Sequence, residues 1–526
     1  MAVSLQMKNI HLLWRAGFGP RAEDIPQLDK KTPKDLLKEI FKSSSKSPQY
    51  INVASNILDG LVKGIQDAGK MQELTKEQKQ QIKKQSREDL KNLNLRWMDE
   101  MVNNEAQLRE KMALFWHGHF ACREINIFFQ QQLLDVIRRN ALGNFGDLLR
   151  EVSKSASMLA FLNNQQNRKQ RPNENFAREV MELFTLGRGN YSEKDIKEAA
   201  RAFTGWGFNL KGEFVFRKNL HDNGVKTVLG KTGDFDGDDL LDILLEQKQT
   251  AIFIAEKIYR YFVNENADKE KTRWLAARFY QSNYDIKKLM EDIFSSDWFY
   301  DDRNVGAKIK SPVELLAGIR RMLPMEFEKE EIQLLYQKLL GQVLFYPPNV
   351  AGWPGGKNWI DSSSLMYRLR LLQLLKDDDS FNATPKSDDD VMMGQMDMEA
   401  GLSKEQIEEK LRKRLKKQGL SDDEADKRVK VVMGNEKLLA AIQNKQQQKN
   451  GNTKAMVNVD IDWKVYNQYF MKLTRESLAQ KISAVLLTAP FADFNVINTY
   501  TDSSSKENYI QTVTIQLMST PEYQMC

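Results

Sequence analysis

The sequence predicts a mainly α-helical protein: one large multi-helical domain with a short β-hairpin or loop excursion near residues 206–236. Apolar residues recur at helical spacing through most of the 526 residues, as in DLLDILLEQ and AIFIAEKIYRYFV. The polar stretch KEQKQQIKKQSREDLKNLNLRWMDEMV is rich in strong helix formers. The excursion differs, because Phe214 and Phe216 alternate with Val215 and Arg217 after a Lys-Gly turn, which is typical of a hairpin.

The composition is that of a globular chain with a sizeable core, since 41% of residues are hydrophobic and 10% are aromatic. The formal charge of +6 is dispersed, and no stretch interleaves basic and aromatic residues, so we expect no nucleic-acid partner. Only Cys122 and Cys526 are present, which argues against disulfides as a structural device.

The sequence shows neither a membrane span nor a signal peptide. No window reaches the roughly 18 apolar residues of a span. The first residues lack a basic flank followed by an apolar run and a cleavage site. We therefore expect no membrane span and, by default, a cytoplasmic protein, with export alongside a partner as the alternative.

Residues 376–452 differ in character from the rest of the chain. An acidic, linker-like run is followed by the charged helical pattern KEQIEEKLRKRLKKQG and the polar tract QQQKNGNTK. We expect residues 1–375 and 453–526 to form a single helical domain. Residues 376–452 are predicted to be a charged, partly disordered insertion or arm.

Near the start, short helices are expected over residues 1–47. His11 lies there among apolar residues, ahead of Trp14 and Phe18. A lone histidine on an apolar face is more often satisfied within the core than used as a ligand.

Two further histidines lie in the apolar segment MALFWHGHF. If the chain is extended around Gly118, His117 and His119 project to the same side, which suits metal chelation. If the segment is helical, the two side chains diverge by about 200° and do not share a metal. Both interpretations, metal ligands and core hydrogen-bonders, stay open at this point.

The rest of the chain is organised around residues 173–206. A proline before it and a glycine within it delimit a helix of about fourteen residues. Glu179 and Glu182 are three residues apart and share one side of that helix. Two carboxylates on a mostly apolar helix suit a metal or acid/base site in a bundle core. The structural alternative is an ion pair with one of the arginines Arg178, Arg188 and Arg201.

The excursion near 206–236 contains one further candidate, the pair His221 and Asp222, which is either a catalytic or liganding pair or a loop histidine without a partner. The nearby Gly-Lys-Thr at 230–232 does not have the glycine spacing of a phosphate-binding loop. The acidic run at 234–239 lacks the register of a calcium loop, and we expect it to cap a helix.

The segment GQVLFYPPNVAGWPGG at 341–356 is rigid, apolar and aromatic. Such a loop either walls a pocket or fixes a chain crossing, and we favour the pocket wall. The residues that we expect to line the pocket or its loops are His11, Arg178, Trp206 and Trp353.

The chain resembles a bacterial family known as domain of unknown function 1800. The resemblance rests on ordered motifs that cover most of the chain: HLLWRAGFGP, LREKMALFWHGHF, NENFAREVMELFTLGRGNYSEKDIKEAARAFTGW, HDNGVKTVLGKTGDFDGDD, IKSPVEL, GQVLFYPPNVAGWPGGKNWI and LMSTPEYQMC. All four histidines and both glutamates fall inside these motifs.

The resemblance implies no particular activity, but it bears on the ligands and on the partner. Many members carry a histidine where this chain has Phe184, so one candidate ligand is missing here. Members often lie beside a gene for a secreted sulfatase-like protein, which implies such a protein as a co-expressed partner.

Two functions follow as hypotheses. The first is a metal-dependent, hydrolase-like enzyme in which His117, His119 and Glu182 hold a divalent metal such as zinc, iron or manganese. Its catalytic residues would be Glu179, Glu182, His221 and Asp222.

The alternative is a non-catalytic helical scaffold that binds a co-expressed secreted sulfatase-like protein through its aromatic loops and charged arm. The histidines and glutamates would then satisfy one another in a buried polar network. Convergence of His117, His119 and Glu182 around an open cleft favours the enzyme, and their dispersal favours the scaffold.

Overall fold

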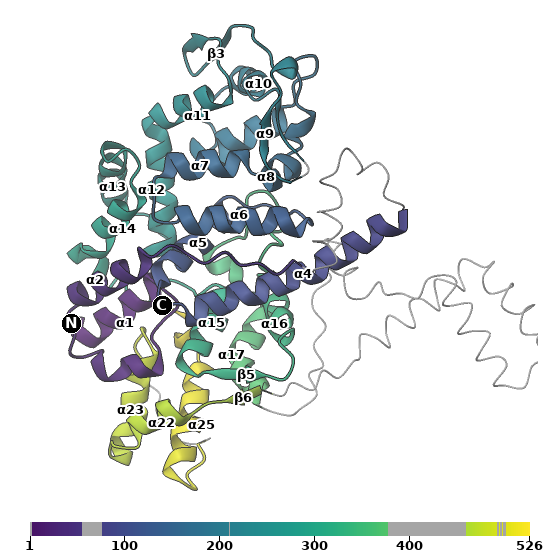
Figure 1. Ribbon diagram of the computed structural model, residues 1–526. Coiled ribbons are helices and arrows are strands. Elements are labelled where there is room, and N and C mark those ends of the chain that lie inside the picture. The colour runs from purple at the N-terminus through teal and green to yellow at the C-terminus, as the bar shows by residue number, and fades with distance from the viewer. Residues whose placement is uncertain are drawn as a thin grey trace, which may run out of the picture. The chain divides into compact units, whose positions relative to one another are not determined.

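The protein is mainly α-helical, as predicted, and strands occur in the described part only as three two-stranded antiparallel sheets (Figure 1). None of the described helices is long and apolar enough to cross a membrane. The predicted insertion at 376–452 lies outside the described residues except for Lys376. The computed structural model describes residues 3–54, 76–209, 211–376, 459–491, 494, 497 and 501–526.

The N-terminal half is a stack of helices around one long buried helix, α5 (Gln107–His119). In α5 every side chain from Leu108 to His117 is buried, and so is His119. The second half of α4 (Lys76–Asn103) is also part of the core, since it buries Leu93, Trp97 and Met101. The other helices of this half are α1 (Leu5–Arg15), η1 (Ala22–Gln27), α2 (Pro33–Ser44), α6 (Ile127–Asn140), α7 (Phe145–Lys154) and α8 (Ala156–Phe161).

The helix predicted from residue 173 is present but irregular. It begins as α9 (Glu174–Glu179), capped by Asn173, and continues as a π-helical turn, η4 (Val180–Thr185). The Thr185 hydroxyl donates to the Val180 carbonyl at 2.7 Å, which helps to satisfy the widened turn. Single π turns of this kind occur often at functional sites. A further helix, α10 (Glu193–Ala202), follows.

The predicted hairpin is confirmed. Strand β1 (Trp206–Phe208) pairs with β2 (Phe214–Phe216), and β3 (Lys226–Val228) pairs with β4 (Lys231–Gly233). The Gly-Lys-Thr sequence forms the turn and fourth strand of the second hairpin, where Leu229 and Gly230 both have positive φ. The acidic run caps the next helix, as expected, because Asp236 accepts hydrogen bonds from two backbone N–H groups.

One strand pair was not anticipated: β5 (Met325–Phe327) pairs with β6 (Val459–Ile461). It joins segments that lie on either side of residues 377–458. The remaining helices are α11 (Gly237–Glu246), α12 (Lys248–Phe262), α13 (Lys269–Gln281), α14 (Ile286–Phe294), α15 (Pro312–Met322), α16 (Ile332–Leu340), α17 (Ser362–Lys376), α22 (Lys464–Phe470), α23 (Arg475–Leu486) and α25 (Lys506–Met518). Short helical turns are η3 (Asn164–Gln166), η5 (Lys218–Leu220), η6 (Asp297–Tyr300), η7 (Gly356–Trp359) and η8 (Glu522–Gln524).

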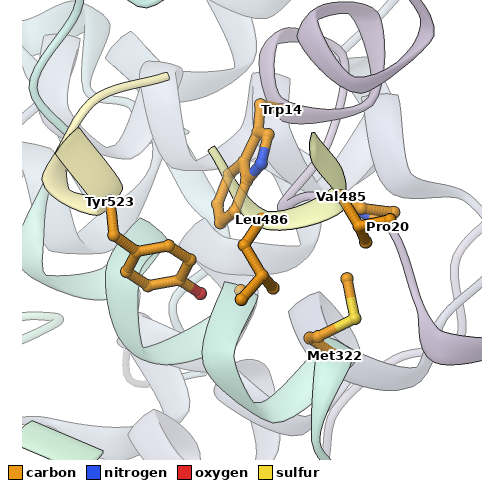
Figure 2. Close-up of a pocket in the computed structure, with 7 residues that line it drawn as sticks. Trp14, Pro20, Met322, Val485, Leu486 and Tyr523 are labelled. Atoms are coloured by element: carbon orange, nitrogen blue, oxygen red, sulfur yellow. The ribbon is translucent and has the colours of Figure 1, made fainter. Parts of the chain in front are cut away.

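Helix α15 is packed closely against the first helix and the last turn of the chain. Trp14 and Tyr523 meet edge to face, with ring centroids 6.5 Å apart (Figure 2). Gly318 on α15 permits this packing, because a Cβ atom there would collide with the Trp14 ring.

Replacing Gly318 with alanine is therefore expected to destabilise the protein by about 1–3 kcal/mol, the usual cost of overpacking a core. Chemical denaturation of the Gly318→Ala variant measures this loss. Gly355→Ala is the matched control, because no atom lies within 4 Å of a Cβ at that position. Equal stability of the two variants would contradict the packing that we describe.

Candidate functional site

His117 lies in the last turn of α5 and holds the loop at 341–356. Its Nε2 accepts a hydrogen bond of 3.1 Å from the Phe345 N–H, so the proton of the neutral ring is on Nδ1. The rings of Trp97, Phe345 and Trp353 surround it, with centroids 5.0–5.4 Å away. Burial lowers the pKa of His117 to about 3, and the side chain is therefore neutral at physiological pH.

The loop that His117 holds has a strained backbone. Phe345 has φ = 69°, in the left-handed region that residues other than glycine rarely adopt. Further along, Gly352 packs directly on the Gly118 carbonyl, where a Cβ atom has no room. The loop is therefore seated on the C-terminal end of α5 at two places.

His119 is bonded through both ring nitrogens. Its Nε2–H donates to the Phe184 carbonyl at 3.2 Å, and its Nδ1 accepts from the Lys257 amine at 2.9 Å. Burial, and secondly the charge of Lys257, hold the pKa of His119 well below its usual value. In this arrangement neither nitrogen has a lone pair available for a metal.

Lys257 is a residue that the sequence analysis missed. It lies on α12, its amine is 5.3 Å from the centroid of the Phe253 ring, and burial lowers its pKa to about 8. The sequence did contain an indication of its burial. Lys257 lies between Ile254 and Ile258, which recur at helical spacing and are both buried.

The two glutamates lie on the α9–η4 helix, Glu179 at the end of α9 and Glu182 in η4. Glu182 accepts a hydrogen bond from the Tyr191 hydroxyl and forms an ion pair of 3.5 Å with Arg188. Burial, and secondly the neighbouring Glu182, raise the pKa of Glu179. Arg178 pairs with other carboxylates, those of Glu174 and Glu193. Of the two glutamates, only Glu182 therefore forms an ion pair with one of the three arginines named in the sequence analysis.

The predicted ligands His117, His119 and Glu182 are not brought together. Among the described residues, no group of three or more histidine, cysteine, aspartate or glutamate side chains is arranged to hold a metal ion. Both histidines lie on the helix α5, which is the case in which they diverge.

His221 and Asp222 bind separate partners in the excursion. His221 Nδ1–H donates to the Thr204 carbonyl at 2.9 Å. Asp222 forms an ion pair with Arg201 at 2.8 Å and accepts a hydrogen bond from the Gly224 N–H. The hydrogen bond from Arg201 is the largest effect lowering the pKa of Asp222. Both side chains fix the loop to the end of α10.

Two of the predicted pocket residues are core residues. His11 is fully buried, and its ring centroid lies 4.6 Å from that of Phe299. Trp206 is buried beneath the Lys154 amine, which lies 5.4 Å from its ring centroid. Cys122 and Cys526 are both buried and unbridged.

A buried ion cluster was also missed. Glu314 is fully buried and pairs with the amines of Lys111 at 2.5 Å and Lys308 at 3.1 Å. These ion pairs, with a hydrogen bond from the Ser311 N–H, lower the pKa of Glu314 despite its burial. Next to it, Lys310 lies 3.7 Å from the Trp14 ring centroid, and burial lowers its pKa to about 7.

Lys111, Lys310 and Glu314 of this cluster come from two of the motifs on which the family resemblance rests. The family described as "Protein of unknown function (DUF1800)" matches residues 11–525. The chain belongs to this family. No curated protein and no solved structure matches the chain. Membership of this family therefore assigns no activity to the chain.

The bond between His117 and Phe345 predicts different outcomes for two substitutions. His117→Gln places an oxygen near the position of Nε2 and keeps an acceptor for the Phe345 N–H. His117→Phe keeps the ring but leaves that buried N–H unpaired, which costs about 1–3 kcal/mol.

Urea denaturation is the measurement, and we expect the phenylalanine variant to be the less stable of the two. If the phenylalanine variant were as stable as the glutamine variant, the Phe345 N–H would not depend on His117.

Proposed function

We propose that this protein is a helical binding module, and that its recognition element is the loop from Gly341 to Gly356. The observation that supports this is the hydrogen bond from the strained Phe345 N–H to His117. Backbone strain of this kind costs about 1–3 kcal/mol and persists only where the surrounding structure imposes it. Such strain is concentrated at ligand-binding and active sites.

The loop is folded so that buried and exposed residues alternate along it. Phe345 and Gly352 are buried against α5, whereas Asn349, Ala351 and Pro354 are exposed. The exposed part is itself held in a turn, because the Gly352 N–H donates to the Asn349 carbonyl at 3.1 Å. The loop is thus anchored on both sides of the surface that it presents.

A rigid loop of this composition suits protein recognition. Binding costs less entropy when the contacting segment is already ordered. Tyr346 and Trp353 are half-buried at its edges, and aromatic residues of this kind supply much of the binding energy at interfaces. The guanidinium of Arg123 lies over the Tyr346 ring, 5.6 Å from the centroid of that ring.

The partner that we propose is the secreted sulfatase-like protein encoded beside members of this family. In this proposal the histidines are structural, because His117 and His119 bond to main-chain groups of the loop and of η4. The charged segment 376–452, predicted to be a second contact with the partner, lies largely outside the described residues.

Co-expression of the tagged chain with this partner tests the proposal. We expect the wild type to capture the partner and Ala351→Glu to bind it at least about tenfold more weakly, because a charge is introduced into the recognition surface. Val225→Glu is the matched control, since Val225 is 64% exposed and lies in a different loop. Absence of capture by the wild type, or capture unchanged in Ala351→Glu, would contradict the proposal.

The metal-dependent hydrolase is the competing proposal, built on His117, His119, Glu179, Glu182, His221 and Asp222. Elemental analysis of purified wild type and of the His117→Ala/Glu182→Ala double variant separates the two. Zinc, iron or manganese near one equivalent in the wild type, and lost in the variant, would favour the hydrolase over the binding module.

A further inference from the structure

A pocket at the C-terminal end of α15 is separate from the loop at 341–356. Its volume is about 320 Å³, and three of its lining residues are Arg21, Arg320 and Arg321. Volumes in this range accommodate small organic ligands. The rest of the wall includes the apolar residues Val102, Pro324 and Met325.

Arg321 is a buried cation that makes no ion pair with a described residue, although the carboxylates of Asp24, Glu105 and Glu23 act on it at longer range. It is 6% exposed, and its guanidinium donates only to neutral main-chain oxygens, those of Gly19 at 2.9 Å and Val102 at 2.7 Å. No described carboxylate forms an ion pair with it, and its Nη2 group makes no hydrogen bond to another described residue. Burial, and secondly the charge of Arg21, lower the pKa of Arg321 to about 9.

Arg320 is fixed in the wall of the pocket by its two terminal groups. Its Nη1 and Nη2 groups bind Gln333 at 2.7 Å and Asp99 at 2.9 Å. Its Nε–H is closed off from solvent and makes no hydrogen bond to another described residue.

The charges around the pocket favour a singly charged anion. Arg21 is already neutralised by Glu105 at 2.6 Å, and the Glu23 carboxylate also lines the pocket. Near these carboxylates a phosphate, with a charge of about −1.5 to −2 at neutral pH, is repelled more strongly than a carboxylate. Arginine donors also match the planar geometry of a carboxylate.

We propose that this pocket binds a small organic carboxylate. The ligand's oxygens accept hydrogen bonds from Arg321. Its carbon chain lies against Val102, Pro324 and Met325. Glu23 accepts a hydrogen bond from a hydroxyl group on the ligand, so a hydroxy acid is bound more tightly than its unsubstituted analogue.

Calorimetric titration of the full chain with lactate, propionate and inorganic phosphate, at constant ionic strength, tests this proposal. We expect lactate to bind more tightly than propionate, and phosphate to bind more weakly than both. Arg321→Met should lower the lactate affinity by about tenfold or more, the usual effect of losing a charge-assisted hydrogen bond. Arg178→Met is the control, because Arg178 is a surface residue that pairs with Glu193.

A second variant covers the case in which Arg321→Met fails to fold. Met325→Trp keeps every charge and fills the pocket, and it should abolish lactate binding. No heat from lactate or propionate with the wild type would overturn the proposal. So would tighter binding of phosphate, or lactate binding that survives in Met325→Trp.

Discussion

Helix α5 is buried on all sides, and that burial requires each of its polar side chains to find a partner. A buried polar group without a hydrogen bond costs about 1–3 kcal/mol, and an unpaired buried charge costs more. Glu110 meets the requirement through Arg138 at 2.9 Å and the Trp97 indole at 3.0 Å. Lys111 meets it through Glu314, and the two histidines through Phe345 and Phe184.

These partners lie on different elements, so the polar groups of α5 connect it to much of the fold. Glu110 bonds to α6 and α4, Lys111 to α15, His117 to the loop at 341–356 and His119 to η4 and α12. The histidines thereby place the loop that we propose as the recognition element. The same bonds occupy Nε2 of His117 and both ring nitrogens of His119.

Much of the fold was predictable, because helical periodicity and turn chemistry are local. The hairpin near 206–236 and the Asp236 cap follow from residues close together in the sequence. The role of His117 could not be predicted in this way, since its hydrogen-bond partner Phe345 is 228 residues away in the sequence. Lys257 and Glu314 were missed for the same reason. A charged residue among apolar positions indicates that it has a buried partner, but it does not identify that partner.

In this structure His117 and His119 are neutral structural residues with fixed and opposite tautomers. The imidazole nitrogen resonances of histidine-labelled protein test this directly, and only four histidines contribute to the spectrum. We expect His117 with its proton on Nδ1, His119 with its proton on Nε2, and neither ring titrating down to about pH 5, since both pKa values lie well below the usual one. Titration of either ring near pH 6.5, or loss of these resonance positions on removing a bound metal, would contradict the account.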